Sequence, residues 1–192
     1  GQAGRQGILP ISHSQDTAGP TPRNVPDAAL LLRVLAGRDP ADAATTNAAW
    51  NTTLDYGARL KPGALKGARI GVLRSKADIH PDAAAALEGA LRVLREAGAT
   101  LVDAEIPTDG QWNADELDLM LYEFKHGLER YLSERKAPLT TLTQLIGYNQ
   151  QYRLSEMPYF GQDLFERANA KGGLGDAGYI TARSRARRLA GP

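Results

Sequence analysis

Four side chains near the start of the chain have the chemical types that a hydrolase uses. Ser12, His13, Ser14 and Asp16 supply hydroxyl nucleophiles, a base and an orienting carboxylate within a few positions. A hydrolytic relay needs these groups to converge, nucleophile against base and base against carboxylate. Because neighbours along an extended chain point to opposite faces, we do not expect these four side chains to form a relay.

The segment around these residues is predicted to be a polar loop between a strand and a helix. The apolar run Ile8–Ile11 precedes it, and Gly19-Pro20 interrupts the chain after it. This pattern indicates a buried strand end that opens into a loop, where binding groups tend to lie. The alternative is a well-capped turn in which Asp16 and Thr17 bond nearby backbone amides.

Other reactive side chains have structural explanations. Neither His80 nor His126 has a partner at metal-ligand spacing, so no metal site is expected. Glu123 and Lys125 fall on different sides of a predicted helix, and a solvated face is their expected environment. The last predicted helix has a basic end that suits the negative pole of the helix dipole. Its basic residues are Arg183, Arg185, Arg187 and Arg188.

Composition excludes several classes of function. The 192 residues are 42% hydrophobic and 23% charged, which suits one domain or a large part of a bigger one. The net charge of +1 gives no reason to expect nucleic acid or an anionic membrane as a partner. The chain has no cysteine, which excludes disulfides, thiol catalysis and cysteine metal ligands within it. No apolar run approaches the length that spans a bilayer.

Hydrophobic periodicity predicts an α/β fold. Strands over residues 68–73 and 100–106, joined by a helix over residues 82–97, predict a parallel pair with a right-handed crossover. We expect Val72 and Val102 on neighbouring buried strands. One helix face should pack over them, formed by Leu87, Leu91 and Leu94.

The remaining pattern is mostly helical. Asn24 is expected to cap a helix that ends before Gly37, and residues 38–65 form a polar surface excursion pinned by Trp50 and Tyr56. The longest helix is predicted over residues 115–136. Thr141 has capping-box spacing to Gln144 at the start of the next helix. Two further helices are expected, over residues 160–170 and 176–190.

Several runs resemble the amidase signature family, and within it the bacterial peptide amidases, which remove the C-terminal amide nitrogen from peptide amides. The likeness covers nearly the whole chain and is diffuse only over residues 45–66. It rests on Gly7-Ile8-Leu9-Pro10, Ser14-Gln15-Asp16-Thr17-Ala18-Gly19-Pro20, Leu35-Ala36-Gly37-Arg38-Asp39-Pro40, Leu121-Tyr122-Glu123-Phe124-Lys125 with Gly127-Leu128-Glu129-Arg130-Tyr131, Phe160-Gly161-Gln162, and the run from Tyr179-Ile180 through Arg187-Arg188-Leu189-Ala190-Gly191-Pro192.

The resemblance implies a fold and a reaction. The fold would be part of the amidase signature fold, a mixed β-sheet core flanked by α-helices. That family uses a serine nucleophile, a second serine in a cis peptide bond and a lysine, in Gly/Ser-rich motifs that this chain lacks. Residues 1–192 would therefore be the middle-to-late portion of one amidase domain, a fragment without its own catalytic residues.

The resemblance also implies a set of cleft-lining residues. They are Ser14, Asp16, Thr17, Tyr122, Glu123 and Arg187. The expected partners are a small-molecule or peptide amide and the upstream and downstream parts of the amidase, with no nucleic acid, membrane, metal or cofactor. The compartment stays open between bacterial cytoplasm and periplasm.

Two function hypotheses follow. In the first, the full enzyme hydrolyses a carboxamide to carboxylate and ammonia through an acyl-enzyme. In the second, the chain is a non-catalytic binding or scaffold module, or a truncated remnant of an amidase. The first hypothesis predicts no activity for this chain alone. It also predicts that the Asp16 carboxylate is fixed by hydrogen bonds to its loop.

Overall fold

The chain folds as two compact units. The first contains the described residues within Gly1–Gly19, Gly37–Ala49 and Thr108–Pro192, and the second those within Pro20–Ala36 and Trp50–Pro107. The computed structural model describes residues 3–46, 55–74 and 80–190.

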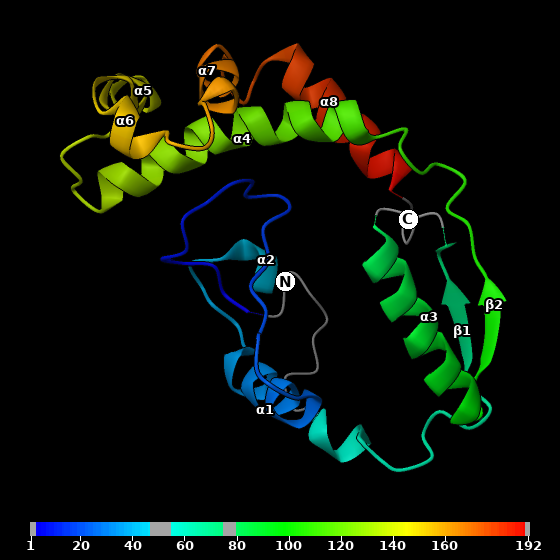
Figure 1. Ribbon diagram of the computed structural model, residues 1–192. Helices are drawn as coiled ribbons and strands as arrows, with labels where there is room; N and C mark the ends of the chain where they lie inside the picture. Colours follow the sequence, from blue (N-terminus) through cyan, green and yellow to red (C-terminus); the bar gives the residue numbers. More distant parts are fainter. Residues whose placement is uncertain (1–2, 47–54, 75–79, 191–192) are drawn as a thin grey trace. The chain divides into compact units, whose positions relative to one another are not determined.

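One long helix organises the first unit. This helix is α4, Asn113–Glu134, and it begins and ends two residues earlier than the sequence predicts. Asp115 and Glu116 lie in its first turn, where acidic side chains complement the helix dipole. Figure 1 shows the other main helices of the unit along α4. They are α5 (Leu142–Gln151), α6 (Arg153–Glu156), α7 (Asp163–Asn169) and α8 (Ala177–Leu189).

The apolar face of α4 forms the core of this unit. Leu121 and Leu128 are buried against Leu142 at the start of α5 and Ala168 of α7. Burying a leucine side chain contributes roughly 1.5–3 kcal/mol. The predicted capping box is confirmed, because the Thr141 side chain accepts from Gln144 N while the Gln144 side chain accepts from Thr141 N.

Two sequence expectations for this unit are wrong. Ile8–Ile11 is not a buried strand end: Ile8, Leu9 and Ile11 are all exposed, and the segment forms no strand. Residues 38–65 are not wholly a surface excursion, since a short helix, α2 (Ala43–Thr46), follows Asp42, and both Asp42 and Thr45 are buried. Trp50 lies outside the described residues.

The second unit contains the predicted parallel pair of strands. β1 (Arg69–Val72) pairs in parallel with β2 (Thr100–Asp103), and Gly71 lies opposite Val102. The crossover helix α3, Pro81–Glu96, is confirmed within one residue at each end. The α/β class is therefore confirmed (Figure 1).

Burial in this sheet follows the prediction only in part. Val72 and Leu91 are buried, as expected, and Leu87 and Leu94 are half-buried. Val102 is 38% exposed, so the expectation that it is buried is wrong. A strand alternates its side chains between two faces, and among the described residues of the unit α3 covers only one face of these strands.

The first helix of the second unit is capped as predicted. α1 spans Val25–Leu35, and the Asn24 side chain accepts a hydrogen bond from Asp27 N. Ala29 is its buried residue, whereas its large apolar side chains are exposed. These side chains are Val25, Leu30, Leu31, Val34 and Leu35.

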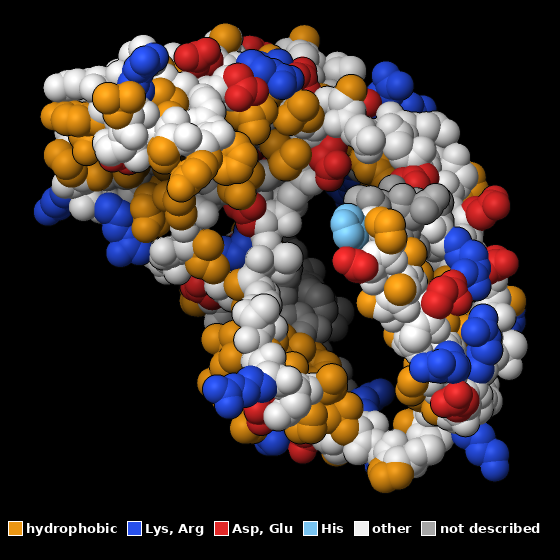
Figure 2. Space-filling view, in the orientation of Figure 1, with side chains coloured by type: hydrophobic (Ala, Val, Ile, Leu, Met, Phe, Trp, Pro, Cys, Tyr) orange, Lys and Arg blue, Asp and Glu red, His pale blue; other side chains and the backbone are white. Residues whose placement is uncertain are grey.

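The first unit also exposes apolar side chains. Figure 2 shows hydrophobic side chains gathered over α5 and α6. The large exposed ones from α6 to α7 are Leu154, Tyr159, Phe160 and Leu164. Across the described ranges, no helix combines the length and the apolar character that a membrane span requires.

Candidate functional site

A buried carboxylate on α4 is the centre of the candidate site. Glu123 is 0% exposed, so the solvated face expected for it is wrong. Helix α8 packs on α4, and the Tyr179 hydroxyl of α8 donates to Glu123 Oε1 at 2.9 Å. Lys125 is also not simply solvated, because its ammonium donates to the carbonyl oxygens of Asn169 and Lys171 at 2.9 and 2.7 Å.

The serine-rich loop converges on the other oxygen of this carboxylate. Ser12 Oγ donates to Glu123 Oε2 at 2.6 Å, and Ser14 donates to the same oxygen through both its backbone N–H and its Oγ, each at 2.9 Å. His13 Nδ1 lies 3.4 Å from this oxygen. Ser12, His13 and Ser14 therefore converge on Glu123 and not on one another, which agrees with the expectation that the loop forms no relay of its own.

These donors keep the carboxylate ionised. Burial raises the pKa of Glu123, but hydrogen bonds from Ser12, Ser14 and Tyr179 outweigh it and lower the pKa below the ordinary value of 4.5. Burial also raises the pKa of Tyr179, and its hydrogen bond to Glu123 raises that pKa further. Glu123 thus acts as a fixed hydrogen-bond acceptor and Tyr179 as a fixed donor.

An ion pair between the N-terminal segment and the residue before α2 also holds this loop. Arg5 and Asp42 form a two-pronged pair, with Nε to Oδ2 at 2.8 Å and Nη2 to Oδ1 at 2.7 Å. Arg5 Nη1 donates to the carbonyl oxygens of His13 and Asp16 at 2.5 and 3.2 Å. The Arg5 guanidinium holds the pKa of Asp42 well below its usual range, so this pair stays charged.

The Asp16 carboxylate is fixed within the loop. Its Oδ2 atom accepts hydrogen bonds from the backbone N–H groups of Ile11 and Ser12, each at 3.0 Å. This is the local bonding of a capped turn, and it agrees with the expectation of a fixed carboxylate. Residues 12–16 are therefore held by Asp16 from within, by Glu123 from α4 and by Arg5 from the N-terminal segment.

The loop forms one wall of a cavity of about 400 Å³. Ser14 and Gln15 line it from the loop, Glu116 from α4, and Arg183 and Arg187 from α8. The cavity therefore brings together two predicted cleft residues, Ser14 and Arg187, which are far apart in the sequence. Its polar wall carries a hydroxyl, an amide, a carboxylate and two guanidinium groups.

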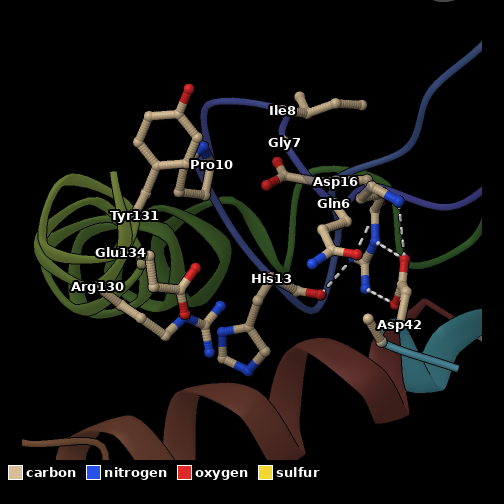
Figure 3. A pocket seen from close by; sticks show the side chains of 13 residues that line it. Gln6, Gly7, Ile8, Pro10, His13, Asp16, Asp42, Arg130, Tyr131 and Glu134 are labelled. Carbon is tan, nitrogen blue, oxygen red and sulfur yellow. Dashed lines mark hydrogen bonds and ion pairs between the residues drawn. The ribbon is translucent and has the colours of Figure 1, made fainter. Parts of the chain in front are cut away.

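A second cavity, of about 340 Å³, lies against the same loop (Figure 3). His13 and Asp16 line it from the loop, and Arg130, Tyr131 and Glu134 line it from the C-terminal half of α4. In Figure 3 the His13 imidazole lies beside Arg130 and Glu134. Asp16 is thus separated from the cavity that contains Ser14 and Arg187.

The remaining predicted residues line neither cavity. Thr17 is exposed, and Tyr122 is buried with its ring 5.7 Å from that of Tyr179. Sequence reasoning missed Arg5, Asp42 and Tyr179. Asp42 lies in a polar stretch, and Arg5 precedes the first run that resembles the family. Neither residue therefore has sequence neighbours that indicate an ion pair. Tyr179 falls in a predicted helix whose pattern gives no sign of its partner.

The described residues contain no group of three or more potential metal ligands. His80 caps α3, since its Nδ1 accepts from Asp82 N at 3.2 Å. His126 Nε2 lies 3.0 Å from the Gly172 carbonyl oxygen. His80 thus contacts the backbone at the start of its own helix, and His126 contacts the segment between α7 and α8.

Comparison with known proteins identifies the family. The sequence model of the Amidase family matches residues 1–190, so this chain belongs to that family. The crystal structure of the native peptide amidase from Stenotrophomonas maltophilia matches the whole chain with a TM-score of 0.91 and 49% identity. A Bacillus anthracis amidase family protein matches 99% of it with a TM-score of 0.84 and 30% identity.

Sequence relatives come from several kingdoms. The probable amidase At4g34880 of Arabidopsis thaliana is 34% identical over 92% of this chain. A glutamyl-tRNA(Gln) amidotransferase subunit from Roseiflexus castenholzii is 41% identical over 56% of it. Plant and fungal relatives mean that the expected bacterial origin is not established. The chain spans 35% of the Arabidopsis protein, 21% of the Roseiflexus protein and 39% of the peptide amidase.

Proposed function

We propose that this chain is part of an amidase that hydrolyses the C-terminal amide of peptides to a carboxylate and ammonia. One observation carries the proposal: the chain matches a solved peptide amidase along its whole length, with 49% identity and a TM-score of 0.91. Local geometry supports it, because a loop lines one wall of a polar cavity, and a partly buried ion pair and a buried hydrogen bond fix the position of that loop.

In this proposal the bond-breaking groups come from the rest of the protein. A serine hydroxyl attacks the carboxamide carbon. Its proton passes, through the family's second serine and lysine, to the leaving nitrogen, and ammonia departs. Water then hydrolyses the acyl-enzyme, releasing the carboxylate and restoring the serine. Residues 1–192 would form the middle-to-late portion of the same domain, in keeping with the 39% of the peptide amidase that the chain spans.

The apolar face of α1 is consistent with this organisation. Its exposed leucine and valine side chains would cost free energy in water, at about 25 cal/mol per Å² of apolar surface. The remainder of an amidase domain would cover that face. The described part of the chain then supplies cleft walls, and the segments beyond it supply the nucleophile.

The substrate class rests on one solved structure. A peptide amidase structure in complex with the competitive inhibitor chymostatin matches this chain with 49% identity. We propose that the cavity lined by Ser14, Gln15 and Arg187 borders the site where a peptide amide binds in the full-length protein. Its hydroxyl, amide and guanidinium groups offer hydrogen bonds to peptide carbonyl oxygens.

The test uses the full-length protein that contains this chain. It is incubated with a peptide amide, and both ammonia and the C-terminal carboxylate are quantified; the same peptide with a free C-terminus is the control. We expect equimolar ammonia and carboxylate from the amide and neither from the control. A full-length protein that folds but releases no ammonia from any carboxamide would support the non-catalytic scaffold instead.

A further inference from the structure

We propose that Glu123 is a positioning residue, which acts through Ser14 to set the shape of the cavity that the loop shares with α4 and α8. This inference rests on the proposed amidase function for its kinetic consequence. Its structural consequence, the fixed position of residues 12–16, stands independently. Glu123 itself lines neither cavity and touches no solvent.

Three segments of the chain form the walls of this cavity. Residues from the loop, from α4 and from α8 line it, and these are the segments that the Glu123 carboxylate joins. Glu123 lies on α4, its Oε2 atom holds Ser12 and Ser14 of the loop, and its Oε1 atom holds Tyr179 of α8. One carboxylate therefore fixes three walls relative to one another.

Ser14 transmits this position to the cavity. It donates twice to Glu123 Oε2, and it also lines the cavity. Its neighbour Gln15, which lines the cavity too, is followed by Asp16, which closes the turn back onto the backbone of Ser12. A shift of Ser14 away from α4 would therefore move the wall of the cavity that the loop forms.

The chemistry of the site requires an ionised carboxylate. The Ser14 backbone N–H can only donate, and it shares Oε2 with two hydroxyl donors. A glutamine side chain has one acceptor oxygen and one amino group. In Glu123→Gln the amide oxygen can take the place of Oε2 and the amino group can donate to the Tyr179 hydroxyl oxygen, so the loop keeps an acceptor but loses its negative charge, and the three hydrogen bonds to it weaken.

A purely structural role for Glu123 is the competing explanation, and a matched control separates the two. Glu129 lies on the same helix, and its Oε1 accepts from the backbone N–H of Leu142 at 3.1 Å. It holds the start of α5 and lines neither cavity. Glu129→Gln therefore removes a carboxylate that also fixes a backbone amide, without touching the loop.

The first measurement does not depend on activity. Hydrogen exchange is followed in the full-length protein for wild type, Glu123→Gln and Glu129→Gln. We expect Glu123→Gln to speed exchange in residues 12–16 at least tenfold while α4 stays protected, and Glu129→Gln to leave the loop unchanged. Unchanged loop exchange in a folded Glu123→Gln protein would overturn the proposal.

The second measurement tests the consequence for the substrate. With a peptide amide, Glu123→Gln should lower kcat/KM roughly tenfold or more, mainly through KM, because hydrogen bonds to a charged acceptor are strong. Glu129→Gln with the same loss of melting temperature should keep the wild-type KM. If both variants change KM equally, Glu123 is only structural and the proposal fails.

A milder variant covers the case in which Glu123→Gln does not fold. Ser14→Ala removes one hydroxyl donor and keeps the backbone N–H donor to Glu123. It should raise loop exchange and KM by a smaller factor than Glu123→Gln, at least twofold. Loop exchange that changes without any amide hydrolysis would refute the proposed function and leave the positioning role standing.

Discussion

The ion pair between Arg5 and Asp42 offers the sharpest test of how the loop is held. Asp42→Ala removes both prongs of the pair, together with the carboxylate that accepts from Arg5 N at 3.1 Å and from Ala44 N at 3.1 Å. Arg5 then keeps only its bonds to the carbonyl oxygens of His13 and Asp16. The loop should therefore lose much of its support on this side.

The expected coupling free energy between Arg5 and Asp42 follows from how far the pair is buried. An exposed ion pair contributes about 0.2–1 kcal/mol, whereas breaking a buried one costs about 3–5 kcal/mol. The side chains of Arg5 and Asp42 are 19% and 7% exposed, which places this pair between those limits. We therefore expect a coupling of about 2 kcal/mol from the double-mutant cycle of Arg5→Ala and Asp42→Ala.

The assay is urea unfolding of the full-length protein, followed by tryptophan fluorescence. The control cycle uses Arg92 and Glu96, an exposed pair on α3 with a 4.0 Å separation. Such pairs contribute about 0.3–0.5 kcal/mol. A coupling for Arg5 and Asp42 no larger than that of the control would refute the claim that this pair fixes the loop.

The same pair predicts a pH dependence with a definite sign. The folded protein depresses the pKa of Asp42 below its ordinary value of 3.8, so the unfolded chain binds the proton more readily. The stabilisation is fully present above that ordinary value and is lost as the pH falls through the lower folded value. The difference in unfolding free energy between wild type and Asp42→Asn should therefore stay constant above about pH 5 and shrink in stronger acid.

Three further outcomes are expected. The 192-residue chain alone should release no ammonia from a peptide amide, and release above the blank that a substitution within the chain abolishes would contradict this. Asp16→Asn keeps an oxygen that can accept both backbone hydrogen bonds, so it should change the free energy of unfolding by less than about 0.5 kcal/mol. Asp16→Ala loses both hydrogen bonds and should lower the free energy of unfolding by about 1–2 kcal/mol. Equal losses for the two variants in urea unfolding would refute this. Leu91→Ala should cost about 2–5 kcal/mol because Leu91 is 3% exposed, and Val93→Ala, at 57% exposed on the same helix, should cost far less in the same assay.

The sequence predicts best those helices, strands and caps that are determined by residues close together in the chain. Helix α3 and its two strands are found within a few residues because leucine spacing and β-branched runs indicate them directly. The capping box at Thr141 is predicted for the same reason, since its two bonds join residues three apart. The exposure of Val102 is missed because alternation alone does not say which face of a strand is covered.

The candidate site could be predicted only in part. The family likeness places Ser14 and Arg187 at a cleft, and both line one cavity. The burial of Glu123 could not be predicted, because its partners Ser12 and Ser14 are more than a hundred residues away and α8 arrives later still. A carboxylate on a helix is expected to be solvated until that long-range packing is known.

For the Ile8–Ile11 segment the sequence suggests burial, whereas Ile8, Leu9 and Ile11 are exposed. Its apolar run suggests a buried strand, but the backbone N–H groups of Ile11 and Ser12 donate to the Asp16 carboxylate, and residues 8–11 form no strand. A backbone amide bonded to a side chain in its own loop cannot also join a sheet. The polar residue four or five positions later therefore decides the structure of the apolar run.

The central claim is that the protein containing this chain is a peptide amidase. Initial rates of ammonia release by the full-length protein, measured against peptide-amide concentration with and without chymostatin, test it most directly. We expect saturable release, and a KM that rises with chymostatin at constant kcat, because the inhibitor is competitive for a solved peptide amidase that matches this chain. Absence of ammonia release from peptide amides by the folded full-length protein would contradict it.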